Sequence, residues 1–266
     1  MSVYTWAMRR FRGKLIVIAL AAGAVLLPGG AMALAAQTAP AAAPAGLLWE
    51  GVASKGTSVF QALEKSPGSI TVANDPTGRF GPSFRYETWD NNGTKSRCES
   101  RGVSGVNLDS SRIGQTVYVG WKAYWDVAIT KGAWTSFWQL HWSGAGPGGG
   151  PLTVRTVGDG KLAFQVVSAD GKSDRNVWTT AFPNRQWNTF VVAIHIARDN
   201  SGWYQFWFNG QQVTFVNGST TWNAPVFKGT HMNLKWGVYR SGRNKGHGVE
   251  FVNDPKLGTT LDSVRP

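Results

Sequence analysis

The chain has 266 residues, a single cysteine, 14 tryptophans and a formal net charge of +12. One cysteine excludes a fold held by internal disulfides, so the hydrophobic core alone has to hold the structure together. The positive charge favours an anionic partner, which can be a nucleic acid, an anionic membrane or an acidic polysaccharide.

Residues 1–36 have the pattern of a secretory signal peptide. Four basic residues precede an apolar run over 15–27, and small residues at 31–35 fit an A-x-A cleavage site. The run is short and is broken at Pro28, which favours cleavage over a membrane anchor. Residues 37–47 are rich in Ala and Pro and are expected to form a linker before one folded domain over 48–266. We therefore expect a secreted chain that has no membrane contact after cleavage.

The charge of the remaining chain narrows the choice of partner. The first 36 residues hold four basic residues and no acidic one, so +8 of the +12 stays with the rest. Lys and Arg form no dense tract there, which argues against a nucleic-acid partner. Indole faces stack well on sugar rings, so the tryptophans of an exported chain favour a carbohydrate, although most of them are expected in the core.

The first long stretches after the linker predict strands and turns rather than helices. Only residues 59–65 are expected to form a short helical turn. Residues 116–129 alternate, which predicts an apolar face and a polar face. The apolar face holds Val117, Val119, Trp121, Ala123, Trp125 and Val127, and the other face holds Tyr118, Gly120, Lys122, Tyr124 and Asp126.

Further strands are expected over 161–168, 189–197, 203–208 and 211–216. The last two are joined by Asn209-Gly210, which is a type I′ hairpin signal, and Asp159-Gly160 and Asp170-Gly171 mark two more turns. Many strands without βαβ alternation predict an all-β fold, either a sandwich or a β-jelly roll. In a jelly roll of this size we expect one sheet to form a concave substrate groove.

Three segments carry polar residues on one face of an expected strand. In FWQLHW (137–142), Trp138, Leu140 and Trp142 point one way and Phe137, Gln139 and His141 the other. In SRCESR (96–101), the shared face holds Arg97, Glu99 and Arg101; in NLKWGVYR (233–240), it holds Lys235, Gly237 and Tyr239. Gly237 is expected to let a ligand approach the backbone closely. Taken singly, Gln139 and His141 also fit a hydrogen-bonded pair in the core, SRCESR fits a ladder of charges on a surface strand, and Tyr239 fits a half-buried aromatic residue.

Taken together, RxExR, QxH and KxGxYR resemble the three signature strands of the β-jelly-roll polysaccharide lyases, a group with alginate, heparin-lyase-I-like and glucuronan lyases. Residues 72–76 (VANDP), 202–210 (GWYQFWFNG) and 258–264 (GTTLDSV) resemble segments of the heparin-lyase-I and glucuronan-lyase side. The resemblance implies β-elimination on an acidic, uronate-containing polysaccharide. A β-1,4-glucuronan or another glucuronate-rich polymer is the favoured substrate, and alginate or heparin-like chains stay open as alternatives.

The resemblance also implies roles for four catalytic residues. Gln139 and Arg97 would neutralise the uronate carboxylate and stabilise the charge that develops when the C5 proton leaves. Tyr239 would carry the proton, with Lys235 and an arginine expected nearby. His141 would act as a donor or as the base. Arg101, Glu99 and Lys235 are predicted to contact the substrate, and so are Tyr118, Lys122 and Tyr124, whose alternative is a solvated sheet face.

Stereochemistry divides the work between two of these residues. In glucuronate and mannuronate, the C5 proton and the C4 oxygen lie on the same side of the ring, so Tyr239 alone can take the proton and return it. In guluronate and iduronate they lie on opposite sides, and His141 would then be the base and Tyr239 the acid.

Other readings of the sequence are open to a lesser degree. A glycosidase needs two placed carboxylates, and the five Glu and ten Asp form no E-x-D-x-x-E or similar pair. A non-catalytic carbohydrate-binding module is the stronger alternative, followed by a secreted adhesin. Cys98 is expected to be a packed side chain rather than a catalytic thiol. No Cys/His cluster or EF-hand-like run predicts a metal or another cofactor, a structural calcium ion is left open, and a monomer is expected.

Overall fold

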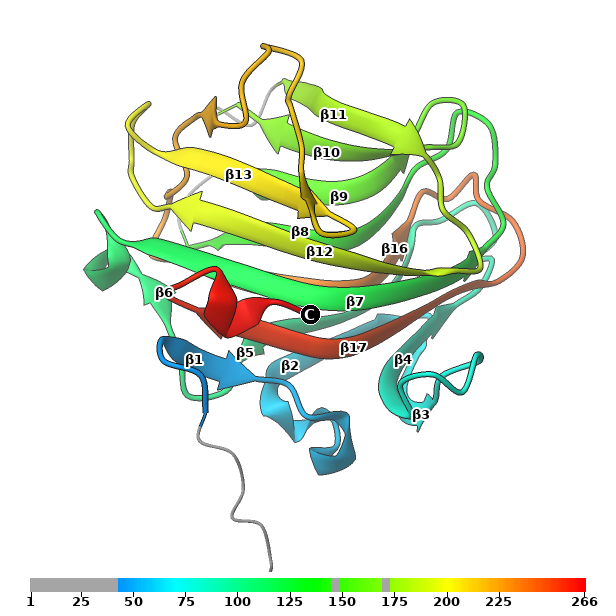
Figure 1. The fold of residues 1–266 in the computed structure, drawn as a ribbon. Helices are drawn as coiled ribbons and strands as arrows, with labels where there is room; N and C mark the ends of the chain where they lie inside the picture. The colour runs from blue at the N-terminus through cyan, green and yellow to red at the C-terminus, as the bar shows by residue number, and fades with distance from the viewer. Residues whose placement is uncertain (1–42, 145–148, 169–172) are drawn as a thin grey trace, which may run out of the picture. The chain divides into compact units, whose positions relative to one another are not determined.

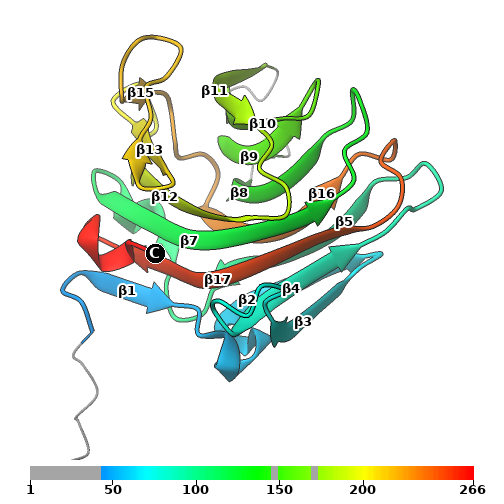
Figure 2. The same ribbon diagram turned by 45° about the vertical axis from the view of Figure 1, so that its right-hand side comes forward.

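Two antiparallel β-sheets pack face to face and make up nearly all of the regular structure (Figures 1 and 2). The computed structural model describes residues 43–144, 149–168 and 173–266. The predicted signal peptide and the Asp170-Gly171 turn lie outside the described residues. Neighbouring strands come from distant parts of the sequence, as in a β-jelly roll, so the predicted all-β fold is confirmed.

Sheet A runs in the order β14-β13-β12-β7-β17-β4-β3, with β1 paired to β17 and β15 to β13. Its strands are β1 (Leu47–Glu50), β3 (Ser69–Asn74), β4 (Pro82–Thr88), β7 (Thr116–Val127), β12 (Trp187–His195), β13 (Trp203–Phe208), β14 (Gln211–Gln212), β15 (Trp222–Asn223) and β17 (Gly248–Gly258). The first strand begins at Leu47, the last residue of the predicted linker, which pairs with Gly258.

Sheet B runs in the order β11-β10-β9-β8-β16-β5-β2, with β6 paired to β16. Its strands are β2 (Phe60–Ser66), β5 (Ser96–Val103), β6 (Leu108–Asp109), β8 (Thr135–Ser143), β9 (Leu152–Val157), β10 (Lys161–Val167), β11 (Asp174–Ala181) and β16 (His231–Arg240). Short 3₁₀ turns cover Ala53–Lys55, Thr57–Val59, Ser110–Arg112 and Asp262–Val264.

The core lies between the two sheets and is rich in aromatic residues. Trp121 of β7 stacks on Trp138 of β8 with ring centroids 5.1 Å apart, and on Phe190 of β12 at 5.0 Å. All six apolar-face residues predicted for β7 are at most 1% exposed. Burial of such large side chains is the main favourable term for the fold, because each Å² of apolar surface removed from water stabilises the folded state by about 25 cal/mol.

Most of the other predicted strands and turns are confirmed. Asn209 and Gly210 both have positive φ, 49° and 79°, as a type I′ turn requires. The strand after this turn is shorter than predicted and covers only Gln211–Gln212. The turn at Asp159-Gly160 joins β9 to β10.

The helical turn predicted over 59–65 is wrong. This segment is strand β2, which pairs with β5 along its length. The misreading has a physical cause: Phe60 is buried and Leu63 packs against the core, and this spacing of three imitates a helix. Pairing with β5 overrides that local pattern. The change matters for the site because it turns Glu64 toward β5 and β16.

Phe137 does not share a face with Gln139, contrary to the alternation. It is 1% exposed in the core, where it stacks on Phe182 and contacts the Trp125 ring at a tilt. The pairing of β8 with β9 shifts by one residue between Ser136 and Trp138, which is the mark of a β-bulge. Two consecutive aromatic residues therefore point inward, and the outward alternation resumes at Gln139.

Gly237 lies at a second irregularity, where the pairing of β16 with β8 shifts between Trp236 and Tyr239. Its φ is 127°, and a Cβ there would meet the carbonyl oxygen of Cys98 at 2.1 Å and the Tyr86 ring at 2.8 Å. Glycine is therefore required by close packing against β5 and the core. The predicted role of Gly237 in admitting a ligand is not needed to explain this residue.

Candidate active site

The three predicted segments lie on neighbouring strands of sheet B, in the order β5, β16, β8. The register pairs Arg101 with Lys235 and Lys235 with Gln139, which forms one row across the sheet. A second row runs from Arg97 through Tyr239 to Ser136. Side chains of one row lie on the same face, so residues far apart in the sequence meet on the outer face of sheet B.

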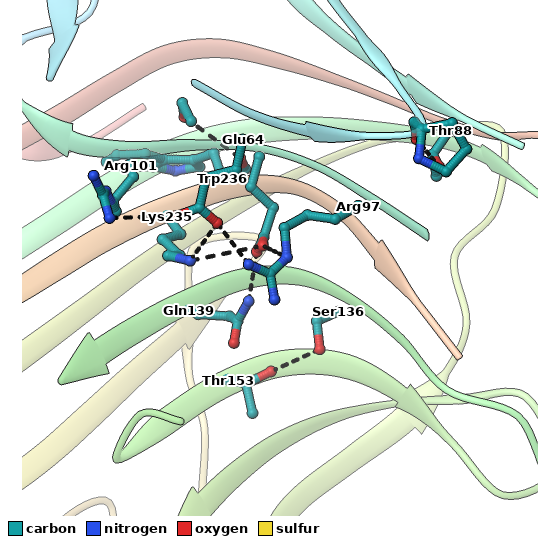
Figure 3. Close-up of polar contacts among 12 residues, drawn as sticks. Glu64, Thr88, Arg97, Arg101, Ser136, Gln139, Thr153, Lys235 and Trp236 are labelled. Atoms are coloured by element: carbon teal, nitrogen blue, oxygen red, sulfur yellow. Dashed lines mark hydrogen bonds and ion pairs between the residues drawn. The ribbon is translucent and has the colours of Figure 1, made fainter. Parts of the chain in front are cut away.

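A compact charge cluster joins these rows, and its centre is a residue that the sequence analysis missed. Glu64 Oε2 accepts hydrogen bonds from Lys235 Nζ and Arg97 Nη1, both at 2.8 Å, and Arg101 Nη1 lies 3.6 Å from its other oxygen. Figure 3 shows the side chains of Glu64, Arg97 and Lys235 pointing toward one another. Burial opposes the charge of Glu64, but Lys235 and Arg97 outweigh it and lower the pKa of this carboxyl.

Glu99 is the second carboxyl of the cluster and is 1% exposed. It accepts a hydrogen bond from Gln139 Nε2, and Arg97 Nε lies 3.2 Å from its other oxygen. Burial raises the pKa of Glu99, although Lys235 and Arg97 oppose the rise. The contact with Glu99 fixes the orientation of the Gln139 amide and leaves the second amide hydrogen of Gln139 available to a ligand.

The Tyr239 ring contacts one cationic and one aromatic side chain. The guanidinium carbon of Arg97 lies 4.3 Å from the centre of the Tyr239 ring, and Trp134 meets the same ring edge-on at 4.9 Å. Burial lowers the pKa of Arg97, but Glu99, Tyr239 and Glu64 together raise it above its usual value, so this guanidinium stays charged. Tyr239 is therefore held next to a permanent positive charge.

A cleft of about 340 Å³ opens beside Tyr239 on the outer face of β8, β9, β10 and β16. Gln139, Tyr239, Trp134 and Arg155 are among the residues that line it. The cleft thus contains an amide donor, a phenol and a guanidinium within one small volume. A larger cavity of about 1080 Å³ lies elsewhere, beside Asp126 and Phe182, but the smaller one coincides with the predicted chemistry.

His141 follows Gln139 at the spacing that returns to the same face of β8, opposite Asn233 of β16. Burial and then the charge of Lys235 lower the pKa of His141 to about 4. The imidazole is therefore neutral at neutral pH and can accept a proton.

Comparison with known protein families shows the family of this chain. Residues 49–254 match the family model described as polysaccharide lyase. The chain belongs to the polysaccharide lyase family.

Solved structures agree on the fold of this lyase. The endo-β-1,4-glucuronan lyase from the fungus Trichoderma reesei has a TM-score of 0.58 at 15% identity, over 78% of this chain and 94% of that one. The PL-14 alginate lyase from Aplysia kurodai has a TM-score of 0.54 at 16% identity, over 81% and 100%. The alginate lyase vAL-1 from Chlorella virus has 0.55 at 9% identity, over 80% and 100%. A search of curated protein sequences finds no match.

Three residues predicted to contact the substrate of the lyase lie elsewhere. Tyr118, Lys122 and Tyr124 are on β7 of sheet A, whereas the cleft is on the outer face of sheet B. Lys122 is ion-paired with Asp254 at 2.9 Å. The prediction that these residues line the same groove as Tyr239 is wrong, because alternation along one strand identifies a polar face but not the sheet to which it belongs.

Cys98 of the lyase is a packed side chain, as expected. It is buried, and its thiol donates to the carbonyl oxygen of Ser69. Burial raises the pKa of Cys98 to about 12, so the reactive thiolate is not populated at neutral pH.

Within the described ranges, no group of three or more His, Cys, Asp or Glu is arranged to hold a metal ion. Across the same residues, no helix is long and apolar enough to cross a membrane.

Proposed function

We propose that the lyase cleaves an acidic, uronate-containing polysaccharide, with β-1,4-glucuronan or another glucuronate-rich polymer as the substrate. The observation that carries this proposal is the meeting of Gln139 and Tyr239 in one cleft, with Arg97 against the Tyr239 ring. The likeness in fold to a glucuronan lyase and the flanking segments of that kind support the choice of polymer.

The elimination needs three things from the protein. The C5 proton is weakly acidic because the neighbouring carboxylate is negative, so that carboxylate has to be neutralised. The Gln139 amide, oriented by Glu99, supplies a donor, and the cluster supplies positive charge. Its three cations, Arg97, Arg101 and Lys235, face two carboxyls, Glu64 and Glu99, which leaves an excess of positive charge beside Gln139 and Tyr239.

The proton then has to move from C5 to the leaving oxygen on C4. In a glucuronate chain both atoms lie on one side of the ring, so a single group can perform both transfers. Tyr239 is the phenol in the cleft. Acting as the phenolate, its oxygen takes the C5 proton and then gives that proton to the C4 oxygen, which regenerates the phenolate; the adjacent Arg97 guanidinium stabilises this negative charge. The C4–O bond breaks as the C4–C5 double bond forms, and each cut leaves an unsaturated uronate end. No water enters the reaction.

Export also belongs to this proposal. A polysaccharide of this kind is met outside the cell, and the pattern of residues 1–36 supports secretion. Cleavage before the folded domain would release the lyase as a free chain.

The test is ultraviolet absorbance from the new double bond conjugated to the carboxylate, on incubation with glucuronan, alginate and heparin. We expect the fastest rise on glucuronan. Tyr239→Phe should abolish the rise and keep polymer binding, whereas Tyr118→Phe, which removes a phenol from sheet A, should leave it unchanged. No rise on any uronate polymer would overturn the proposal in favour of a non-catalytic carbohydrate-binding module.

A further inference from the structure

Each cation of the predicted motifs already contacts a carboxyl of the protein. Arg97 contacts Glu64 at 2.8 Å and Glu99 at 3.2 Å, and Lys235 contacts Glu64 at 2.8 Å. Arg101 lies 3.6 Å from Glu64. These contacts fix the cluster and position Tyr239, but they also occupy the groups that would otherwise grip a substrate carboxylate most directly.

Arg155 differs from all of them. It lies on β9, opposite Ser136, in the row that also holds Tyr239, and it lines the same cleft. Among the described residues, no carboxylate lies within 4.0 Å of its guanidinium. Its Nη1 donates to Gln165 Oε1 at 3.0 Å, and its Nε is buried without a hydrogen-bond partner. An unpaired buried donor costs about 1–3 kcal/mol, and no described protein group offsets that cost at the Nε of Arg155.

The surroundings hold Arg155 without using up its hydrogen-bond donors. Its guanidinium carbon lies 4.7 Å from the centre of the Trp134 ring, and Trp134 also contacts Tyr239. Stacking on an indole fixes the plane of a guanidinium, and the N–H groups that Gln165 does not use keep their in-plane directions for a charge-assisted contact. Burial lowers the pKa of Arg155, with Asp174 and Tyr239 acting in the opposite direction. Asp174 is exposed at the edge of the cleft and makes no ion pair with it.

We propose that Arg155 binds the carboxylate of a second uronate, next to the sugar that is cleaved, and thereby makes the lyase select runs of consecutive uronates. The inference rests on the proposed function, since it assumes that Gln139 and Tyr239 serve the reacting sugar. Arg155 lies across Ser136 from Tyr239, two strands along the sheet, which is about 9.6 Å in the pairing direction, and one strand from β8, which carries Gln139. A polymer in which uronates alternate with neutral or amino sugars presents no carboxylate there.

The experiment measures binding rather than turnover, in the inactive Tyr239→Phe chain. Dissociation constants are determined for glucuronan, which has consecutive uronates, and for hyaluronan, in which glucuronate alternates with N-acetylglucosamine. Adding Arg155→Gln should weaken glucuronan binding about 10- to 100-fold, the range of a charge-assisted hydrogen bond, and change hyaluronan binding less than about threefold. Arg79→Gln removes the same charge from the β3–β4 loop of sheet A and should change neither by more than about twofold.

Several outcomes would overturn the inference. Equal weakening on both polymers would mean that Arg155 adds only general positive charge, and unchanged glucuronan binding would mean that it makes no contact. Failure of the Tyr239→Phe chain to bind glucuronan would also overturn it. If Arg155→Gln does not fold, Arg155→Lys keeps the charge but loses the bidentate geometry, and should still weaken glucuronan selectively. Absence of turnover by the unmodified lyase, with Arg155-dependent binding intact, would overturn the proposed function and leave only the part of this inference that concerns binding of consecutive uronates.

Discussion

The guanidinium of Arg97 lies over the ring of Tyr239, with 4.3 Å between the guanidinium carbon and the ring centroid. The register of β5 against β16 makes this contact, because Arg97 and Tyr239 are paired directly. The nitrogen atoms of the same guanidinium contact the carboxyls of Glu64 and Glu99. The contact therefore couples the charge cluster to the phenol that we assign as proton carrier.

Arg97→Lys should lower kcat by about 10- to 100-fold, because an ammonium cannot stack on the ring and contact both carboxyls at once. Sheet A offers a matched control. Arg85 contacts Glu87 at 2.8 Å and lies over the Phe251 ring at 5.9 Å, and Arg85→Lys should leave kcat unchanged. Steady-state kinetics on glucuronan measures both, and equal kcat for Arg97→Lys and the unmodified lyase would contradict the role given to Arg97.

Glu64→Gln should destabilise the lyase by about 3 kcal/mol, because it removes the closest carboxylate from Lys235, whose side chain is only 3% exposed. Glu87→Gln is the control: Glu87 is as exposed as Glu64, at 20% against 21%, but its partner Arg85 is 27% exposed. We expect a loss of about 1 kcal/mol there. Urea unfolding compares the two, and the expectation fails if Glu87→Gln is the more damaging change.

His141→Ala tests the stereochemical route. If Tyr239 carries the proton alone on glucuronan, the loss in kcat on that polymer should be less than about tenfold, since His141 then contributes only a hydrogen bond. On guluronate-rich alginate, where a separate base is needed, any activity should fall by about 10²-fold or more.

The pH profile on alginate gives a second check on His141. Because its pKa is about 4, the imidazole stays neutral and able to accept a proton down to mildly acidic pH. The alginate rate of the unmodified lyase should therefore not fall between neutral pH and about pH 5 through His141. A fall centred near the usual histidine pKa would show that His141 is protonated more easily than its surroundings imply.

Glu250→Gln should change how stability depends on pH. The Glu250 side chain is completely buried, and one oxygen accepts a hydrogen bond from Trp125 Nε1 at 2.8 Å. Burial raises the pKa of Glu250 well above its ordinary value. The folded chain therefore holds this proton more tightly than the unfolded chain, so its stabilising effect is complete below the ordinary pKa and is lost as pH rises toward the raised one.

Glutamine keeps the acceptor for Trp125 and cannot ionise, so it removes that loss. Unfolding free energies from about pH 5 to about pH 8 should diverge in favour of Glu250→Gln, by up to about 1.4 kcal/mol per pH unit. Glu99, whose pKa is also raised, is present in both chains and cancels in the comparison. Parallel curves would show that Glu250 is ionised in the folded lyase.

Glu250 also contacts the backbone of a site strand from the core side of sheet B. It lies against the backbone N–H of Gly237, at the irregularity between Trp236 and Tyr239. Trp125, its hydrogen-bond donor, stacks on Phe137 at the bulge of β8. One buried polar pair is therefore in contact with both departures from regular pairing in the strands that present Gln139 and Tyr239.

Alternation was a sound guide where a strand is regular and misleading where it is not. It placed Arg97, Glu99 and Arg101 on one face, and the register confirms this because β5 pairs with β16 over these residues without a shift. It failed at Phe137, since a bulge inserts one residue and turns it inward. No local signal marks that bulge, because the reason for it is the aromatic packing between the sheets.

Residue order along the chain was enough to predict an all-β fold and the strand faces of Gln139 and Tyr239, which follow from side-chain periodicity and chemical type, both local properties. The family was predicted from the resemblance of three motifs to known lyases, and the match over 49–254 confirms it. Which sheet a polar face belongs to, the recruitment of Glu64, and the unpaired donor of Arg155 beside Tyr239 were decided only by tertiary structure. Each depends on strands far apart in the sequence lying side by side, and strand pairing is set by burial of the whole core rather than by any one segment.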